Sequence, residues 1–264
     1  PLSPPVSATA LKASLLVNVP KLKTHGFTGM TASLKNLFGC IPGRHKARCH
    51  LSFPHLTHFG RLLWDLWSLL PPSLHVVDAI VAMEGQGPRN GTPCSMGYLI
   101  AGCSPAAVDL TCVHLLGMPQ SVVPYLDPEQ IPSGHPRSWT EVRLRGSLPD
   151  PSRRVFQVRQ SRPSDLESTR HFPLRLRPWI LPRPRVAKRN CTRCGQCLEI
   201  CPSRPRSLTR TRKGYPVWHP RTCLYCFCCQ EICPHGAMTR KEPMAARILG
   251  LLKKDTVPPT TRHR

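Results

Sequence analysis

Acidic residues are scarce in this chain, and a long apolar stretch is missing. Against 37 lysines and arginines stand 14 aspartates and glutamates, which leaves a formal charge of +23. A balance this basic favours acidic partners, nucleic acid or anionic surfaces, without choosing among them. The best candidate for a long apolar segment is residues 98–118, but Pro105, Asp109 and His114 interrupt it. Because a membrane-spanning helix needs about 20 apolar residues, we expect no transmembrane segment in this chain.

Several signatures of familiar protein classes are also missing. The pair Gly85 and Gly87 lacks the third glycine and the following helix of a dinucleotide-binding loop. The sequence contains neither a phosphate-binding P-loop nor a Ser-His-Asp signature. The first residue is Pro1 rather than methionine, so we expect the first domain to be incomplete at its N-terminus. The sequence does not decide whether a targeting segment precedes Pro1.

Strand and helix patterns alternate over residues 13–118. Apolar, β-branched runs predict strands over 15–19, 75–83 and 98–101, and apolar spacing predicts helices over 31–38, 55–70 and 105–116. Glycines and polar residues predict loops over 21–30 and 84–93, and residues 1–12 fit no element. This alternation predicts an α/β domain with a mainly parallel sheet, which we place at residues 1–135.

Arginine and proline dominate the next segment. Thirteen arginines lie between Arg137 and Arg189, and we interpret 136–188 as a connector with strands at 139–144 and 154–158. Its charge is consistent with docking of an acidic redox partner, with nucleic-acid binding or with a compositional bias. Aromatic residues are too widely spaced there for a base-stacking platform, so nucleic acid is not favoured. Residues 241–264 form a basic tail with a short amphipathic helix over 245–252.

Nine of the fourteen cysteines fall between Cys191 and Cys233. They form two C-x2-C-x2-C-x3-C-P motifs, the spacing of bacterial-type two-cluster ferredoxins, in which the fourth cysteine reaches the other cluster. The motifs therefore predict two [4Fe-4S] clusters in a small α+β two-cluster ferredoxin-like domain at 189–240. Cluster 1 is expected on Cys191, Cys194, Cys197 and Cys233, and cluster 2 on Cys223, Cys226, Cys229 and Cys201.

Zinc is the alternative metal, but two consecutive four-cysteine motifs that each end in Cys-Pro fit a zinc ribbon poorly. Cys228 is out of register and is interpreted as a buried thiol, with an alternative ligand or a redox-sensitive thiol as the other reading. The cysteines outside the motifs are expected to be buried thiols, namely Cys40, Cys49, Cys94, Cys103 and Cys112. Clustered short spacings indicate metal ligation in a reducing compartment, so we expect a cytoplasmic location.

Several ordered motifs carry a family resemblance. The segments 18–25, 31–39, 77–88 and 102–109, together with the Cys226-Phe-Cys-Cys229 core, resemble the domain-of-unknown-function 362 family in its form fused to a ferredoxin module. The resemblance covers roughly residues 13–118 and 189–240. It implies an α/β domain joined to a ferredoxin module and does not imply a settled reaction.

The α/β domain offers polar candidates at the ends of its strands, where open α/β sheets bind ligands. Lys21, Lys23 and His25 follow the first strand, and Asp78 lies within the next one. The catalytic candidates are Lys23, His25, Lys35, Asn36 and Glu84. The alternative to a catalytic role is a structural one: each of these side chains, and Asp109, is then a surface charge or a hydrogen-bonded core group.

Three functions follow from these observations. The first is electron transfer to an unknown redox partner protein. The second is an iron–sulfur oxidoreductase with a substrate pocket around Lys23, His25, Lys35 and Glu84. The third is a basic nucleic-acid-binding protein whose clusters are structural. The motifs alone do not name a substrate, so whether the chain is an enzyme stays open.

Overall fold

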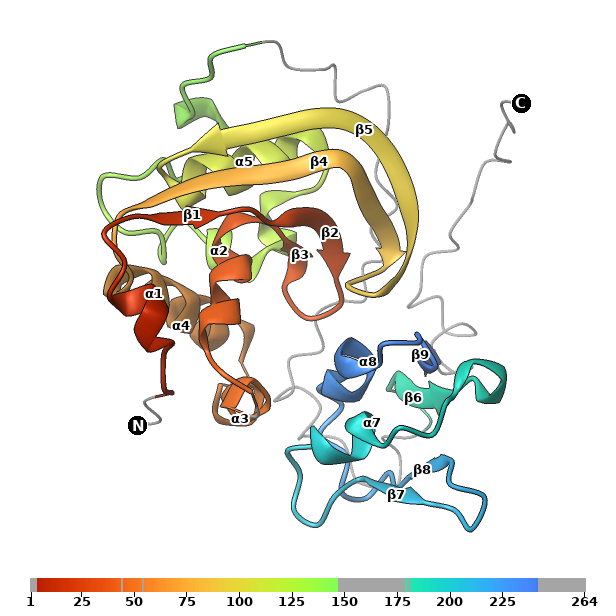
Figure 1. The fold of residues 1–264 in the computed structure, drawn as a ribbon. Helices are drawn as coiled ribbons and strands as arrows, with labels where there is room; N and C mark the ends of the chain where they lie inside the picture. Colours follow the sequence, from red (N-terminus) through yellow and green to blue (C-terminus); the bar gives the residue numbers. More distant parts are fainter. Residues whose placement is uncertain (1–3, 44, 54, 147–178, 180, 242–264) are drawn as a thin grey trace, which may run out of the picture.

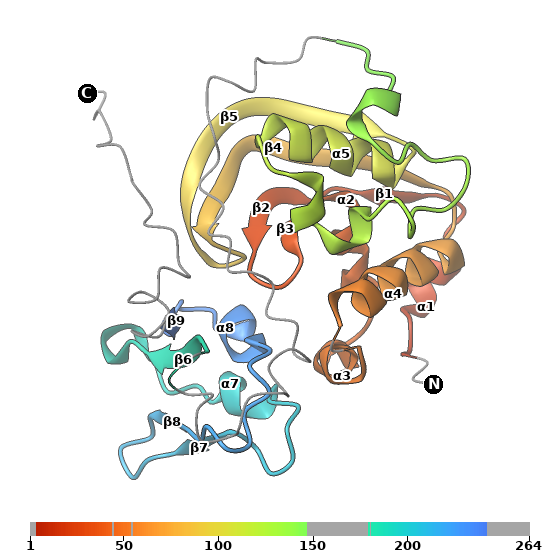
Figure 2. The ribbon, with the colours of Figure 1, turned by 180° about the vertical axis from the view of Figure 1, so that it is seen from behind.

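The structure is a computed structural model that describes residues 4–43, 45–53, 55–146, 179 and 181–241, and these form two parts (Figure 1). The first part is a curved sheet with helices packed against it. The second is a small module that contains both cysteine motifs. Figure 2 shows from behind that the module lies beside the β2–β3 turn and the tip of the β4–β5 hairpin.

Strand β4 (Ser73–Gln86) is the centre of the five-stranded sheet. β1 (Leu16–Asn18) and β2 (Lys21–His25) pair with it in parallel at successive stretches. β5 (Asn90–Gly102) pairs with β4 antiparallel, and β3 (Gly29–Thr31) pairs with β2 antiparallel. Parallel pairs at the centre and packed helices confirm the α/β class predicted from the sequence.

Two predicted loops are strands, so these predictions are wrong. Residues 21–30 form the β2–β3 hairpin, in which Leu22 and Thr24 are buried between less buried neighbours. Residues 84–93 extend β4 and β5 into one long hairpin. Its glycines allow close approach, since a side chain at Gly87 would collide with the backbone carbonyl of Thr24. Pairing partners distant in sequence decide these strands, and the local pattern does not contain them.

The two longest predicted helices are present. α4 (Leu56–Leu69) buries the side chains of Phe59, Leu63 and Leu66, as its apolar stripe predicts, and ends before Pro71. α5 (Pro105–Leu115) begins at Ser104, whose hydroxyl accepts a hydrogen bond from the Ala107 N–H. A shorter helix, α2 (Ser33–Leu37), and the 3-10 turn η1 (Phe38–Cys40) replace the predicted helix over 31–38.

Other helices differ from the prediction. α1 (Ala8–Leu11) and α3 (His45–Ser52) have no counterpart in the predicted elements. Further 3-10 turns are η2 (Gln120–Val122) and η3 (Pro124–Leu126). The strand predicted at 139–144 is wrong, because η4 (Trp139–Glu141) begins there and Trp139 stacks on His114 with ring centroids 4.0 Å apart. The elements predicted over 154–158 and 245–252 lie outside the described residues.

Asp109 of α5 is fully buried and holds the start of α2. Its two carboxylate oxygens accept hydrogen bonds from the backbone N–H groups of Ser33 and Leu34, at 2.6 and 2.9 Å. These are donors that a helix leaves unpaired in its first turn. The carboxylate therefore joins two helices across the core, so Asp109 is a hydrogen-bonded core group, one of the two alternatives given for it in the sequence analysis.

We expect Asp109→Asn to lower the free energy of unfolding by about 2 kcal/mol, because its amide NH2 would face a buried N–H donor.

The pH dependence of stability is a second expected effect of Asp109. Burial raises the pKa of Asp109 to about 7, against the opposing hydrogen bonds from Leu34 and Ser33. An unfolded carboxyl titrates near pH ~3.9, so the folded state holds a proton that the unfolded chain releases. The stability contributed by Asp109 is therefore present at low pH and declines as the pH rises towards 7.

Urea unfolding of the wild type and of Asp109→Asn at pH 5.5 and pH 8 measures this effect. The loss of stability between these two pH values should be smaller in the variant. Asp65→Asn on α4 is the control, since Asp65 is an exposed aspartate on the surface of the same domain. Equal stability of the two variants would show that the cap contributes nothing.

The module contains two pairs of antiparallel strands and two short helices. β6 (Arg183–Val186) pairs with β9 (Met238–Lys241), and β7 (Leu208–Arg210) pairs with β8 (Pro216–Trp218). The helices are α7 (Gln196–Glu199) and α8 (Cys228–Ile232), and η6 (Lys188–Asn190) precedes the first motif. Gly214 has a positive φ and turns the chain before β8. β6 begins within the segment interpreted as a connector.

Candidate metal centres

The two cysteine loops have the same backbone shape. The residue two positions after the first cysteine has a left-handed conformation in both loops, with φ of 61° at Arg193 and 56° at Tyr225. The residue four positions after it does so again, with φ of 87° at Gly195 and 56° at Phe227. Each loop then enters a short helix, α7 or α8. The spacing of the cysteines therefore corresponds to a repeated wrapping conformation, formed once in each motif.

The first loop borders a cavity of about 390 Å³, called cavity 1 here. Its wall contains three cysteines of the first motif, Cys191, Cys194 and Cys197, and one of the second motif, Cys233. The backbone N–H of Ala237 donates a hydrogen bond to Cys233 Sγ at 3.2 Å. Such bonds stabilise a thiolate, the form in which cysteine binds metal.

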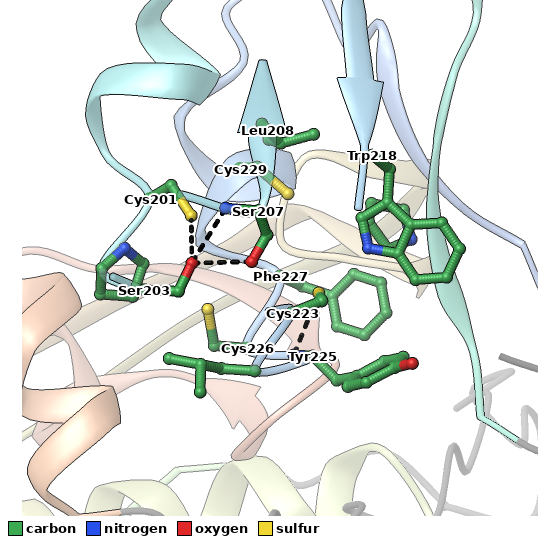
Figure 3. A pocket seen from close by; sticks show the side chains of 13 residues that line it. Cys201, Ser203, Ser207, Leu208, Trp218, Cys223, Tyr225, Cys226, Phe227 and Cys229 are labelled. Atoms are coloured by element: carbon green, nitrogen blue, oxygen red, sulfur yellow. Dashed lines mark hydrogen bonds between the residues drawn. The ribbon is translucent and has the colours of Figure 1, made fainter. Parts of the chain in front are cut away.

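The second loop borders a cavity of about 380 Å³, called cavity 2 (Figure 3). Cys223, Cys226 and Cys229 come from the second motif and Cys201 from the first. The Tyr225 N–H donates to Cys223 Sγ at 3.4 Å, and the Ser203 hydroxyl lies 3.0 Å from Cys201 Sγ. Leu208, Trp218 and Phe227 complete an apolar wall.

The cysteine sets suit a four-iron cluster better than a single ion. Among the described residues, no three histidine, cysteine or carboxylate side chains are grouped closely enough to share one metal ion. The cysteines instead lie around two cavities of nearly equal size, four to each. A cubane is bound by four thiolates at its corners, whereas zinc draws four sulfurs to about 2.3 Å from one atom.

The remaining cysteines lie outside the walls of cavities 1 and 2. Cys228 is buried at the start of α8, where its thiol hydrogen-bonds with Cys226. Cys49, Cys94 and Cys112 are buried as expected, but Cys103 is exposed and Cys40 is half-buried, so the expectation is wrong for Cys103. All fourteen cysteines fall within the described residues.

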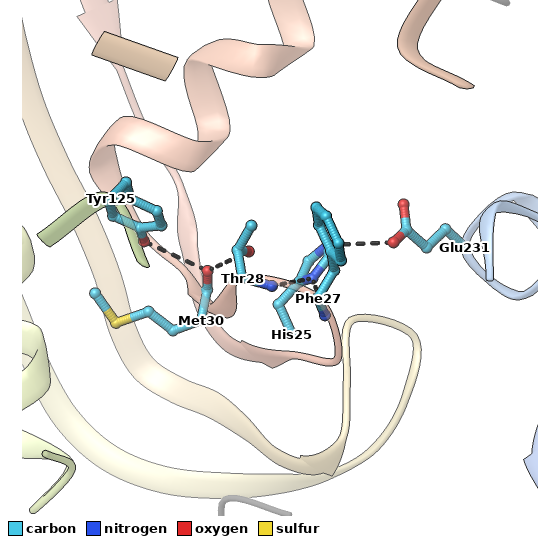
Figure 4. A network of polar contacts seen from close by, with 6 residues as sticks. All are labelled: His25, Phe27, Thr28, Met30, Tyr125 and Glu231. Carbon is cyan, nitrogen blue, oxygen red and sulfur yellow. Dashed lines mark hydrogen bonds and ion pairs between the residues drawn. The ribbon is translucent and has the colours of Figure 1, made fainter. Parts of the chain in front are cut away.

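Glu231 of α8 contacts the α/β domain through His25 of β2 (Figure 4). His25 Nδ1 accepts hydrogen bonds from the N–H groups of Phe27 and Thr28, at 3.1 and 3.3 Å. A nitrogen that accepts has no proton, so the proton of the neutral ring is on Nε2. That nitrogen lies 3.3 Å from Glu231 Oε1 and donates to it. Burial has the largest effect on the pKa of His25 and lowers it, although Glu231 opposes the shift, and a lowered pKa is consistent with a neutral ring.

Two lysines lie around the same carboxylate. Burial lowers the pKa of Lys35 on α2 and of Lys23 on β2, and Glu231 opposes both shifts. Burial alone would raise the pKa of Glu231, but His25 and the nearby cations, Lys35 among them, lower it to about 2. The structure thus brings together three of the sequence candidates, Lys23, His25 and Lys35, and adds Glu231, which the sequence analysis missed.

The other candidates have different surroundings. Asn36 is exposed and donates through Nδ2 to Asn18 Oδ1 at 2.8 Å, in a network with His75. Lys21 forms an ion pair with Asp78 at the surface. Glu84 lies on β4, one residue beyond Met83, which is in register with Lys23. Asn36 therefore belongs to a network between β1, β4 and α2.

The two loops differ in what their side chains contact. In the second loop, Tyr225 is buried in the hydrophobic cluster of the α/β core, and Phe227 packs against this cluster. The equivalent residues of the first loop are Arg193, which is exposed, and Gly195. Glu231 likewise contacts His25, whereas its equivalent in the first motif, Glu199, is exposed. The second loop therefore packs on the α/β domain, and the first faces solvent.

Comparisons with known proteins agree with this two-part organisation. Residues 3–114 match the family described as a domain of unknown function (DUF362), and residues 190–237 match a 4Fe-4S dicluster domain. The thylakoid-associated protein sll1697 of Synechocystis sp. is 36% identical over 120 residues, which cover 45% of this chain and 37% of that protein. These matches confirm the fusion inferred from the motifs. Within the described part of the chain, no helix is long and apolar enough to cross a membrane.

Proposed function

We propose that this chain, in which a domain of unknown function 362 is fused to a 4Fe-4S dicluster domain, binds two [4Fe-4S] clusters and serves as an electron-transfer protein. The observation that supports two clusters is the composition of the cavity walls. Each contains three cysteines from one motif and one from the other. When bound, such clusters supply one-electron redox chemistry.

The chain's own residues contribute binding, hydrogen bonds and shielding. Cys191, Cys194, Cys197 and Cys233 would hold one cluster, and Cys201, Cys223, Cys226 and Cys229 the other. The N–H groups of Tyr225 and Ala237 donate to ligand sulfurs, and hydrogen bonds of this kind tune the potential of a cluster. Trp218 and Phe227 contribute apolar surface to the wall of cavity 2.

The contacts of Lys23, His25 and Lys35 favour a role in holding the module rather than a substrate pocket, because these groups surround Glu231. The oxidoreductase and the nucleic-acid-binding alternatives therefore stay hypotheses. The clustered short spacings of the cysteines are typical of metal ligation in a reducing compartment, and we propose a cytoplasmic location on that basis. The partner and the substrate are not named by these contacts.

Protein purified without oxygen is expected to contain about eight irons and eight sulfides, with two interacting paramagnetic signals after reduction. Cys228→Ala is the matched control, since Cys228 lies inside the second motif but outside the wall of cavity 2. It should retain the full iron content. Iron and sulfide analysis with low-temperature EPR checks both expectations, and zinc in place of iron would contradict the proposal.

A further inference from the structure

Basic side chains surround the exposed side of cavity 1. We call this set the basic rim and define it as Lys188, Arg193, Arg210, Arg212 and Lys213, all of which are exposed. Arg193 lines cavity 1 directly, and Arg212 and Lys213 precede Gly214, which also lines it. Cys194 is the exposed ligand candidate between them. The rim therefore borders the place where the first loop is open to solvent.

Three of the five rim side chains are held in position by contacts within the module. Lys188 Nζ and Arg193 Cζ lie 5.7 and 5.6 Å from the centroid of the Tyr215 ring, within the range of cation–π attraction. Arg210 reaches over Gly195 and donates to the Arg193 carbonyl at 3.5 Å. A side chain at Gly195 would collide with the guanidinium of Arg210. Positioned charges lose less entropy on binding a partner than mobile ones do.

Little negative charge opposes the rim. Residues 183–241 contain thirteen lysines and arginines but two acidic residues, Glu199 and Glu231. Glu231 contacts His25 and the surrounding lysines of the α/β domain. Two clusters at roughly −2 each would leave the module positive. The β7–β8 hairpin, which carries part of the rim, lies at the end of the module away from the α/β domain (Figures 1 and 2).

We propose that the basic rim is the docking surface for an acidic electron-carrier protein. This inference deepens the proposed function and rests on it. Charge complementarity at such a surface orients a partner and accelerates encounter. Nucleic acid fits less well, because stacking of bases needs an open aromatic face. Tyr215, the ring in this region, is only partly exposed and is covered by Lys188 and Arg193.

The test is a matched pair of charge reversals in the full, cluster-loaded chain. Arg212→Glu/Lys213→Glu changes the rim. Lys12→Glu/Arg61→Glu changes by the same net charge two exposed residues of the α/β domain, one directly after α1 and one on α4. The probe is an acidic plant-type [2Fe–2S] ferredoxin, and its affinity is measured at several salt concentrations. We expect the rim pair to weaken binding about tenfold at low salt and to flatten the salt dependence, with a much smaller effect of the control pair.

Equal losses in the two pairs would show an effect of net charge alone and would overturn the docking surface, as would absence of binding at low salt. A single-stranded oligonucleotide is the second probe. If the rim pair weakens oligonucleotide binding and leaves ferredoxin binding unchanged, the surface binds nucleic acid and the proposal is wrong. The iron and sulfide contents show which proposal fails. If the protein contains no clusters, the proposed electron-transfer function is wrong. If it contains clusters but the rim pair and the control pair weaken ferredoxin binding equally, only the docking surface is wrong.

Discussion

The double variant Cys191→Ala/Cys233→Ala is expected to retain about four irons, whereas Cys191→Ala/Cys201→Ala is expected to retain almost none. In the first variant both substitutions fall on cavity 1, so cavity 2 keeps its four cysteines. In the second, each cavity loses one cysteine. The two variants remove the same number of thiols, and they differ only in how these are shared between the cavities.

The two double variants distinguish two ways of sharing the cysteines. In the crossed arrangement each cluster takes its fourth cysteine from the other motif, and in the uncrossed arrangement all four come from one motif, which predicts the opposite result. If each motif bound its own cluster, Cys191→Ala/Cys201→Ala would lose one cluster and Cys191→Ala/Cys233→Ala would lose both. Iron and sulfide counting after anaerobic purification, with EPR of the reduced protein, measures the outcome. Higher iron content in Cys191→Ala/Cys201→Ala would refute the crossed assignment, whatever the absolute amounts.

Glu231→Ala is expected to loosen the contact between the module and the α/β domain and to cost about 2 kcal/mol, within the range for a hydrogen bond to a charged group. The carboxylate side chain is 28% exposed, so its contacts are partly screened. Removing it leaves Lys35 and Lys23 close together in a buried region without the neighbouring negative charge. Glu231→Gln should cost less, since the amide oxygen still accepts from His25.

The matched control is Glu199→Ala. Glu199 occupies the same position in the first motif, two residues before its fourth cysteine, but it is exposed. Hydrogen exchange of the backbone amides in β2 and α8 measures the loosening, and cluster absorbance checks that the module is intact. Exchange should increase in the order Glu199→Ala, Glu231→Gln, Glu231→Ala. Equal protection in all three would show that the His25–Glu231 contact does not hold the two parts together.

Local sequence patterns predicted the elements that depend on local physics. The stripe of Phe59, Leu63 and Leu66 predicts α4, and Ser104-Pro105 predicts the start of α5. The cysteine spacing likewise predicts the shape of both loops, because three closely spaced ligands must wrap around one object. The β2–β3 hairpin escaped prediction, because the strand character of β2 comes from pairing with β4, where Lys21 is in register with Asp78 and Lys23 with Met83.

The sequence predicted the site residues of the α/β domain but not the residue of the cysteine module that contacts them. Lys23, His25 and Lys35 were candidates because of their positions after a strand and on a helix, and the structure gathers them. Their partner Glu231 could not be found in the same way. Glu199 and Glu231 have the same local sequence context, Glu-Ile-Cys-Pro, and only the packing of the module decides which of them contacts the α/β domain.

Phe227 has a left-handed backbone where the first motif has Gly195. A residue with a Cβ pays roughly 1–2 kcal/mol for that conformation. The aromatic ring packs against the α/β core, with Arg240 5.1 Å from its centroid. A module with two nearly equivalent halves could attach in either of two orientations related by half a turn. The strained phenylalanine places an aromatic ring on the α/β core where the first loop has only Gly195, so the second cysteine loop has an attachment that the first one lacks.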